Sequence, residues 1–178
     1  MTFDYDQSHS QVEFSVKHMM FSTVRGRFKK INGELDLNEQ NPTASSASFI
    51  IDVASIDTGD EKRDGHLRSP DFFDAAQFPT IEFHSTKVVA AGNEKFHVTG
   101  NLTMHGVTKE VTLEVVQDGH FKDMQGGDRY ALSIATNVNR KEYGLNWNVA
   151  LEAGGVMVSE NVAINIEVQV KQVAPATA

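Results

Sequence analysis

The sequence of 178 residues contains no cysteine, and it has only one tryptophan and four prolines. The absence of cysteine excludes disulfide bonds, thiolate metal sites and cysteine nucleophiles, but it does not identify the redox compartment. No run of about 18 apolar residues is present, so we expect no transmembrane helix. The first residues also lack the basic start, apolar stretch and cleavage site of a secretory signal. We therefore expect a cytoplasmic protein as the sequence is written, or a periplasmic one if it is a trimmed mature form.

Positive charge is also in deficit, because 16 basic residues stand against 24 acidic ones and the net charge is −8. An acidic protein repels a phosphate backbone, so nucleic acid is not an expected partner. The basic stretch at 25–30 is better explained as a solvated outer face or as a transient contact with an anionic membrane. The length fits a single domain over residues 1–172, followed by a loose tail at 173–178.

Helical periodicity is scarce, and alternation of apolar and polar residues dominates instead. In residues 11–18, Val12, Phe14 and Val16 share one face, whereas Glu13 and Lys17 occupy the other. The same alternation predicts strands at 11–18, 23–31, 46–53, 80–89, 95–104, 106–117, 129–138 and 161–171. Short, turn-like connections favour antiparallel pairing. Strands of this length suit a tilted barrel better than a sandwich, and a barrel of about eight strands encloses either packed side chains or one small ligand.

A charged cluster interrupts this pattern between the strands at 46–53 and 80–89. Thr58 and Glu61 fit a capping box, which predicts a short helix over 59–68. Leu67 is the only large aliphatic residue in that helix, so the helix cannot be held in place by its own burial.

Three phenylalanines follow this predicted helix, at positions 72, 73 and 78. Exposure of all three rings would leave a large apolar patch, so we expect them to face inward. Rings placed in the lumen would make the segment a plug or lid over one end of the barrel. The alternative is that they only complete the core.

Four stretches carry a more specific signal: SHSQVEFSVKHMMFSTVRGRF (8–28), IDTGDEKRDGHLRSPDFFDAAQFPTIEF (56–83), GNLTMHGVTKEV (100–111) and NRKEYGLNWN (139–148). They resemble the YceI family of lipocalin-like, polyisoprenoid-binding proteins over almost the whole chain. The resemblance implies an all-β fold, namely an eight-stranded antiparallel lipocalin-like β-barrel with a short helical insertion closing one end. It also implies an apolar channel for a long isoprenoid tail and a homodimeric assembly.

The ligand implied by the resemblance is a polyprenyl chain or an isoprenoid quinone, bound without covalent attachment, and no other cofactor is expected. Such a tail needs a deep site lined by apolar side chains. The predicted ligand-binding residues are Phe14, Val16, His18, Val24, Phe28, Phe49, Ile51, Phe72, Phe73, Phe83, Val98, Leu113, Leu132, Ile134, Arg140, Trp147 and Ile164.

Within this set, His18, Arg140 and Trp147 are the candidates for contact with a polar head group. The alternatives are a histidine that bonds to the backbone and a packed loop corner around the tryptophan.

Catalysis is not expected. The seven histidines show none of the short spacings that set two imidazoles on one metal, and no nucleophile elbow is present. We predict a protein that stores, transports or sequesters a lipid. Two alternatives remain open: a filled barrel with a structural or stress-related interaction role, and an enzyme that acts on a lipid head group.

Overall fold

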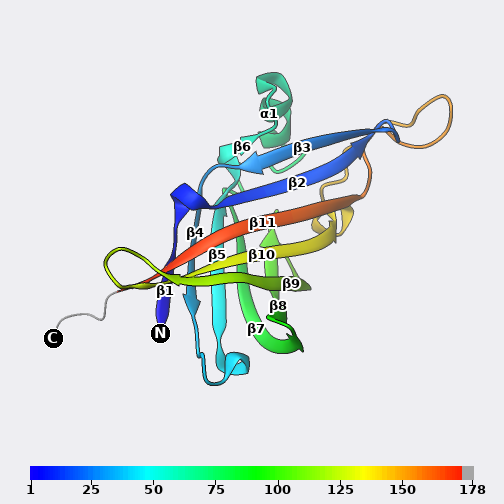
Figure 1. Cartoon of the computed structure of the whole chain (residues 1–178). Helices are drawn as coiled ribbons and strands as arrows, with labels where there is room; N and C mark the ends of the chain where they lie inside the picture. The colour runs from blue at the N-terminus through cyan, green and yellow to red at the C-terminus, as the bar shows by residue number, and fades with distance from the viewer. Residues whose placement is uncertain (174–178) are drawn as a thin grey trace.

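The computed structural model describes residues 1–173, in which nearly all regular structure is antiparallel β-sheet (Figure 1). The strands are β1 (Thr2–Tyr5), β2 (Gln11–His18), β3 (Ser22–Phe28), β4 (Ile31–Asp36), β5 (Ser46–Asp52), β6 (Ile56–Asp57), β7 (Thr80–Gly92), β8 (Lys95–Met104), β9 (Val107–Lys122), β10 (Asp128–Asn139) and β11 (Asn161–Gln172). The helices are α1 (Glu61–Arg68) and the short 3₁₀ turns η1 (Gln7–His9), η2 (Pro42–Ala44), η3 (Val53–Ser55) and η4 (Arg140–Tyr143).

Eight strands close into a barrel, in the order β1, β4, β5, β7, β8, β9, β10 and β11, with β1 pairing back to β11. Every pairing in this ring is antiparallel. The predicted eight-stranded antiparallel barrel is therefore confirmed. Strands β2, β3 and β6 continue the sheet from β11 and form the wall beside α1 (Figure 1).

The N-terminal segment pairs twice with β11, and this arrangement was not predicted. Strand β1 pairs with residues 170–172 and β2 pairs with residues 163–167. Between the two strands, the turn η1 is fixed by Asp6, whose carboxylate accepts bonds from Ser8 and from Arg129 Nη1 at 2.6 Å. One stretch of chain thus closes the barrel at one end and starts the extended wall at the other.

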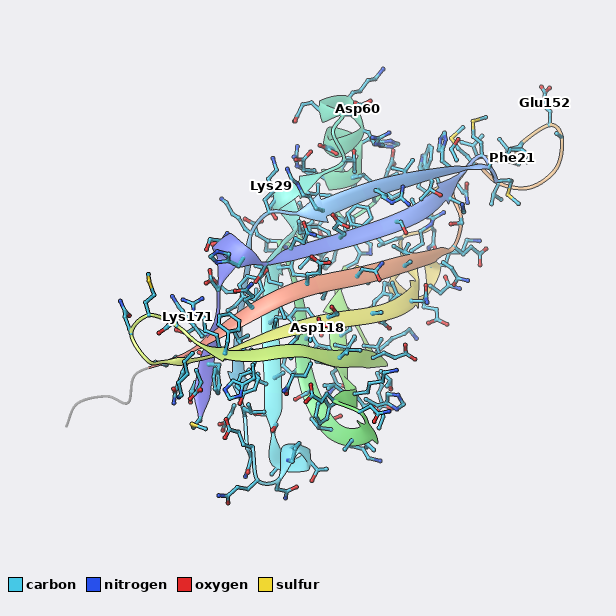
Figure 2. The ribbon with its side chains drawn as sticks, viewed as in Figure 1. Phe21, Lys29, Asp60, Asp118, Glu152 and Lys171 are labelled. Atoms are coloured by element: carbon cyan, nitrogen blue, oxygen red, sulfur yellow. The ribbon has the colours of Figure 1, made fainter. Side chains whose placement is uncertain are left out.

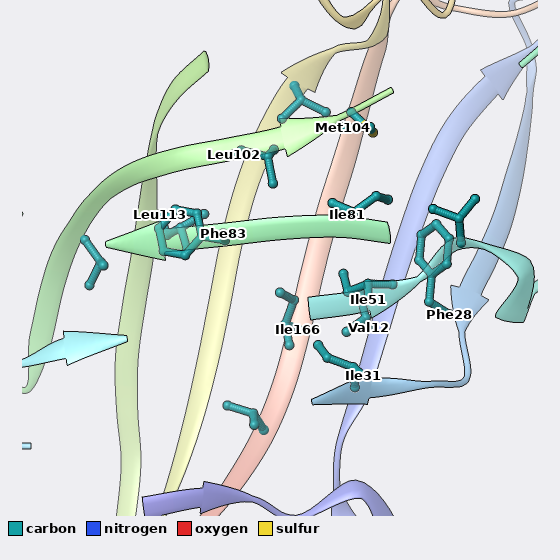
Figure 3. Close-up of a cluster of buried hydrophobic side chains, with 14 of the residues drawn as sticks. Val12, Phe28, Ile31, Ile51, Ile81, Phe83, Leu102, Met104, Leu113 and Ile166 are labelled. Carbon is teal, nitrogen blue, oxygen red and sulfur yellow. The ribbon is translucent and has the colours of Figure 1, made fainter. Parts of the chain in front are cut away.

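Apolar side chains from alternating positions fill the interior (Figure 3). Val12, Ile51, Ile81, Leu102 and Ile166 are all buried and come from five different strands. The alternation in the sequence therefore gave the correct inward face for each of these strands.

Glycines 33 and 100 lie in strand interiors where the neighbouring strand leaves little room for a side chain. A Cβ atom at Gly33 would lie 3.3 Å from Cβ of Phe49, and one at Gly100 would lie 2.5 Å from Cζ of Phe83. Gly100 also sits beside a register shift between β7 and β8. The missing side chain at Gly100 makes room for the ring of Phe83.

The helix α1 begins later than predicted. Its N-cap is Asp60, whose side chain accepts a bond from the backbone N–H of Arg63, so the Thr58 capping box was wrong. Thr58 instead donates to the buried carboxylate of Asp64, through its backbone N–H at 2.9 Å and its hydroxyl at 2.6 Å. Arg68 adds bonds to the carbonyls of residues 54 and 56. Polar contacts to the barrel rim hold this mostly hydrophilic helix over one end, as the fold prediction required.

No helix within residues 1–173 is long and apolar enough to cross a lipid bilayer. Most of the predicted tail, residues 174–178, lies outside the described residues. Val173 precedes it and donates its backbone N–H to the carbonyl of Thr2 at 2.9 Å.

Candidate ligand-binding site

An apolar cavity of about 130 Å³ lies inside the barrel at the end covered by α1. Of the described residues that line it, all but Thr136 and Arg140 have apolar side chains. The lining consists of Val12, Phe14, Val16, Phe28, Phe49, Ile51, Leu67, Phe72, Phe73, Ile81, Phe83, Leu102, Met104, Leu113, Thr136, Val138, Arg140, Leu145, Val158, Val162, Ile164 and Ile166. We call this space the first cavity.

Aromatic rings form one wall of the first cavity. The ring centroids of Phe14 and Phe28 are 5.5 Å apart, and those of Phe28 and Phe73 are 6.0 Å apart. Gly26, opposite Phe14 on the neighbouring strand, leaves the space that the Phe14 ring occupies, since a Cβ there would lie 2.3 Å from Cζ of Phe14. Pairs of rings at these distances add about 0.5–1.5 kcal/mol each beyond the area they bury.

The end of α1 and the segment that follows it close the cavity from outside. Leu67, Phe72 and Phe73 all line the cavity, and Phe72 is buried. On its outer side, Phe72 packs against Trp147, with ring centroids 5.3 Å apart, and both rings contact His66. The segment therefore acts as a lid that is fixed to the loop after η4. Phe78 does not join it, because its ring packs against His105 instead, at 4.7 Å, and is absent from the cavity lining.

Arg140 is the one ionisable residue among the described residues that line the first cavity. Its side chain is buried and donates to four backbone carbonyls: those of Leu145, Trp147, Val158 and Ser159, at 2.6–3.2 Å. Burial lowers the pKa of the guanidinium from its usual value, and the negative charge of Glu160 opposes this effect. A guanidinium nevertheless stays protonated in proteins, so the carbonyl dipoles stabilise a buried cation.

This geometry differs from the predicted use of Arg140 as a head-group donor. Four of its five N–H groups are already used within the protein, where they hold the segment from 145 to 159 against the barrel. The cavity therefore presents an almost wholly apolar surface to a ligand. Sequence patterns do not reveal this role, because the four acceptors are backbone atoms of a loop.

A second cavity of about 280 Å³ lies at the opposite end of the barrel. Its lining consists of Leu35, Leu37, Glu39, Pro42, Ser45, Ser46, Ala47, Val88, Phe96, Val98, Val115, Gln117, His120, Tyr130 and Leu132. The Tyr130 hydroxyl donates to Glu39, and the His120 ring stacks on the Tyr130 ring with centroids 4.3 Å apart. Burial, together with the bond to Glu39, raises the pKa of Tyr130. This end of the barrel therefore combines an apolar interior with a polar rim.

A stacked pair of rings separates the two cavities. Phe49 and Phe83 are directly paired across β5 and β7, and their centroids are 5.1 Å apart. Along β8, Phe96 and Val98 line the second cavity and Leu102 lines the first, with the Phe83 ring lying over Gly100 between them. The interior is thus two hollows and a packed layer, whereas the sequence interpretation expected one continuous channel.

The predicted ligand-binding residues fall into three groups. Those that line the first cavity are Phe14, Val16, Phe28, Phe49, Ile51, Phe72, Phe73, Phe83, Leu113, Arg140 and Ile164. Val98 and Leu132 line the second cavity. Four line neither cavity: Ile134, His18, Val24 and Trp147.

Trp147 packs on the outer side of Phe72, as described above, and the other three also have a defined place in the structure. Ile134 lies on β10 between Leu132 of the second cavity and Thr136 of the first. His18 ends β2 and forms an isolated bridge with Val158. Val24 pairs with Val16 across the hairpin.

Several lining residues were not among the predicted ones, and two kinds of signal account for them. Val12, Ile81, Leu102 and Ile166 follow the period of two in their strands, so the same pattern identifies them. Val158 lies in a loop, where no periodicity exists, and only its tertiary position places it in the cavity wall.

Comparison with known proteins agrees with this architecture. The YceI-like domain family matches residues 3–170. A UPF0312 protein from Staphylococcus epidermidis is 39% identical over 161 residues, which covers 90% of this chain and 91% of that protein. A UPF0312 protein from Vibrio parahaemolyticus is 37% identical over 142 residues, covering 80% of this chain and 75% of that protein.

Solved structures show the same fold. The crystal structure of Burkholderia cenocepacia BcnA has a TM-score of 0.81 and 26% identity, covering 93% of this chain and 99% of that chain. The Campylobacter jejuni YceI protein has a TM-score of 0.77 and 28% identity, covering 89% and 90%. A polyisoprenoid-binding domain from Saccharophagus degradans has a TM-score of 0.71 and 17% identity, covering 96% and 98%, and so shares the fold. The match along nearly the whole chain shows that this protein belongs to the YceI-like family.

Proposed function

We propose that the protein binds a long-chain apolar lipid, of which a polyisoprenoid is the leading candidate, inside the barrel. One observation carries this proposal: the first cavity is walled by aromatic and aliphatic side chains, and the guanidinium of Arg140 in its lining already donates to backbone carbonyls. Such a surface offers a ligand hydrophobic transfer of about 0.8 kcal/mol per CH₂ group and almost no polar contact. The fold shared with a polyisoprenoid-binding domain supports the same ligand class.

The size of the interior sets a condition on this function. Ligand cavities usually measure about 300–1,000 Å³, which exceeds the 130 Å³ of the first cavity. The first and second cavities together reach that range. A long tail therefore requires the Phe49 and Phe83 rings to change rotamer, so that the two hollows join.

We infer a binding role rather than catalysis, because a reaction would need convergent titratable groups. Among the described residues that line the first cavity, Arg140 alone is ionisable, and its N–H donors are engaged. Storage, transport and sequestration of the lipid are all compatible with such a site.

Organic extraction of the purified protein, followed by mass spectrometry and by titration with a polyprenol, tests the proposal. We expect a co-purified long-chain lipid or uptake of the added one. A cavity-filling variant, Val162→Trp, should reduce uptake, whereas Asn161→Trp on the exposed side of the same strand should not. If neither lipid nor uptake is found, the small volume of the first cavity would favour the alternative, a filled barrel with a structural role.

A further inference from the structure

Four large apolar side chains project into solvent at one tip of the molecule. Met19, Met20 and Phe21 form the turn between β2 and β3 and are 46%, 55% and 90% exposed, and Val149 of the neighbouring loop is 42% exposed. Backbone bonds join the two segments: Met157 donates to Val149 at 2.9 Å, and Met19 donates to Met157 at 2.7 Å. Figure 2 shows Phe21 at the far end of the β2–β3 hairpin, beyond the barrel. We call Met19, Met20, Phe21 and Val149 the apolar tip.

Turn geometry does not explain the residues of the apolar tip. Met19 and Met20 have φ angles of 52° and 67°, in the left-handed region that glycine and asparagine occupy at least cost. A turn chosen only to connect two strands would carry those residues. Two methionines held there, next to an exposed phenylalanine, indicate that the side chains themselves are used.

The loop beside the apolar tip is also poor in polar residues. Residues 149–157 read VALEAGGVM, and Glu152 carries the only charge among them. Surface loops are normally polar, and a contiguous apolar patch on a soluble protein marks an interaction site. Met20 packs against this loop, since a Cβ at Gly155 would lie 3.2 Å from its sulfur. The hairpin turn and the loop thus form one surface.

Basic side chains stand directly behind the apolar tip. Lys17 and Arg25 are exposed on the outer face of the hairpin, and within the described residues neither forms an ion pair. Lys17 precedes Met19 by two residues, about 7 Å along a strand. The head-group layer on each side of a bilayer is about 5–8 Å thick. A tip buried in acyl chains would therefore place Lys17 among the head groups.

We propose that the apolar tip is a docking site for an anionic lipid bilayer, with Phe21 and the two methionines inserted and Lys17 and Arg25 against the head groups. The surface adjoins the first cavity, because Val16 and Val158 line that cavity and His18 bridges to Val158. Although the chain carries a net charge of −8, the face that holds Lys17 and Arg25 presents positive charge to an anionic membrane. Transfer of a lipid from membrane to cavity, which rests on the proposed function, would take place here.

A second copy of the chain fits this surface less well than a bilayer. The apolar tip is a narrow, convex projection of four side chains, whereas a stable interface buries about 800 Å² on each partner and requires a complementary surface. Fluid acyl chains need no complementary shape. Self-association through the tip is therefore an outcome that the test must detect.

Sedimentation with vesicles tests the docking surface. The wild-type protein should bind phosphatidylcholine vesicles that contain a quarter phosphatidylglycerol, and bind pure phosphatidylcholine more weakly. Binding should fall as salt is added, because screening weakens contacts to the head groups. Phe21→Ser should weaken vesicle binding about tenfold or more, because one large apolar side chain no longer inserts.

Matched controls come from the other end of the molecule. Met124 is fully exposed in the turn between β9 and β10, so Met124→Ser removes a similar side chain without touching the apolar tip. It should leave vesicle binding unchanged. Because the chain lacks cysteine, Phe21→Cys and Met124→Cys each accept one environment-sensitive dye, and only the dye at position 21 should report an apolar environment.

Two results would overturn the docking proposal. The first is that Phe21→Ser and wild type bind vesicles equally. The second is that wild type forms a dimer which Phe21→Ser loses, while neither protein binds vesicles.

A separate measurement tests whether the cavity binds lipid. Polyprenol added from a detergent solution bypasses the membrane, so its uptake by Phe21→Ser should equal that of wild type. Absence of that uptake in both proteins, together with intact vesicle binding, would contradict the proposed function alone.

Discussion

The ring of Phe83 lies against the backbone of Gly100, so that a Cβ atom at position 100 would stand 2.5 Å from Cζ of the ring and 2.4 Å from the carbonyl oxygen of His84. Both distances are shorter than van der Waals contact allows. The position of the ring in the middle of the barrel therefore depends on a residue without a side chain. That ring, stacked on Phe49, separates the two cavities.

Substitution of this glycine tests the close contact. Gly100→Ala should lower the free energy of unfolding by about 1–3 kcal/mol, because the carbonyl oxygen belongs to the backbone and cannot rotate away. Urea denaturation followed by tryptophan fluorescence measures the change. Gly119→Ala is the matched control in a neighbouring strand, since a Cβ there has no atom within 4 Å. Equal stability of Gly100→Ala and wild type would contradict the packing described.

Removal of the Phe83 ring should allow the barrel to bind longer lipids but should lower the stability of the fold. Phe83→Ala should reduce the free energy of unfolding by about 3–5 kcal/mol, because it leaves a void in a buried layer. It should also join the two cavities, so that the variant binds longer polyprenols than wild type does. Phe121→Ala, which removes an exposed ring of β9, is the control. An unchanged preference for chain length in Phe83→Ala would show that the ring does not limit the site.

Loss of the Arg140 side chain should release the loop to which the lid is fixed. Arg140→Met leaves four carbonyls without their donor, and we expect a loss of about 2–4 kcal/mol in the free energy of unfolding. Amide hydrogens in residues 145–159 should exchange faster than in wild type. Lys141→Met is a suitable control, since Lys141 forms an exposed pair with Glu160, and such pairs contribute less than about 1 kcal/mol. Unaltered amide exchange in Arg140→Met would show that Arg140 does not hold the loop at 145–159 against the barrel.

Acid should weaken the contacts by which Asp6 holds the N-terminal turn η1 against the barrel. Hydrogen bonds from Ser8, and then from Arg129 and His9, hold the pKa of this carboxyl well below its usual range. Because the folded pKa lies below the unfolded one, the charged form adds stability above about pH 4, and this stability is lost as the pH falls through the folded value.

Asp6→Asn should therefore cost about 2 kcal/mol at neutral pH and flatten the decline in stability below about pH 4. Urea midpoints measured over a series of pH values give both quantities. Asp36→Asn serves as the control, because the carboxylate of Asp36 is mostly exposed and pairs only with the terminal amine. If the stability of Asp6→Asn and of wild type declined in parallel as the pH falls, Asp6 would not be the group responsible for the acid sensitivity.

The strands were predictable because their signal is local. Where an inward face is buried and an outward one solvated, as in β2 and β11, the period of two is visible over eight or more residues. The four residues of β1 are too few to show it, and their partner Gln172 is far away in the chain. Closure of the barrel by this strand was therefore beyond the reach of sequence periodicity.

The site was predictable in composition but not in its internal detail. Alternation assigned Phe49 and Phe83 to the inner face, yet it cannot say that two inward rings stack and divide the lumen. The helix start was misplaced because Thr58 and Asp60 both suit an N-cap, and the choice depends on Asp64 accepting both bonds from Thr58. Arg140 was assigned to a head group because its true acceptors are contributed by residues folded around it.

Strand β1 contributes three residue pairs to β11 and three to β4, whereas β10 and β11 share eleven. The barrel wall is therefore held least firmly at β1, and thermal fluctuations should separate β1 from its neighbours before they separate the longer strand pairs. Opening along β1 would uncover Phe3, whose ring packs on Tyr130 in the lining of the second cavity, so hydrogen exchange in the barrel should be fastest along this strand.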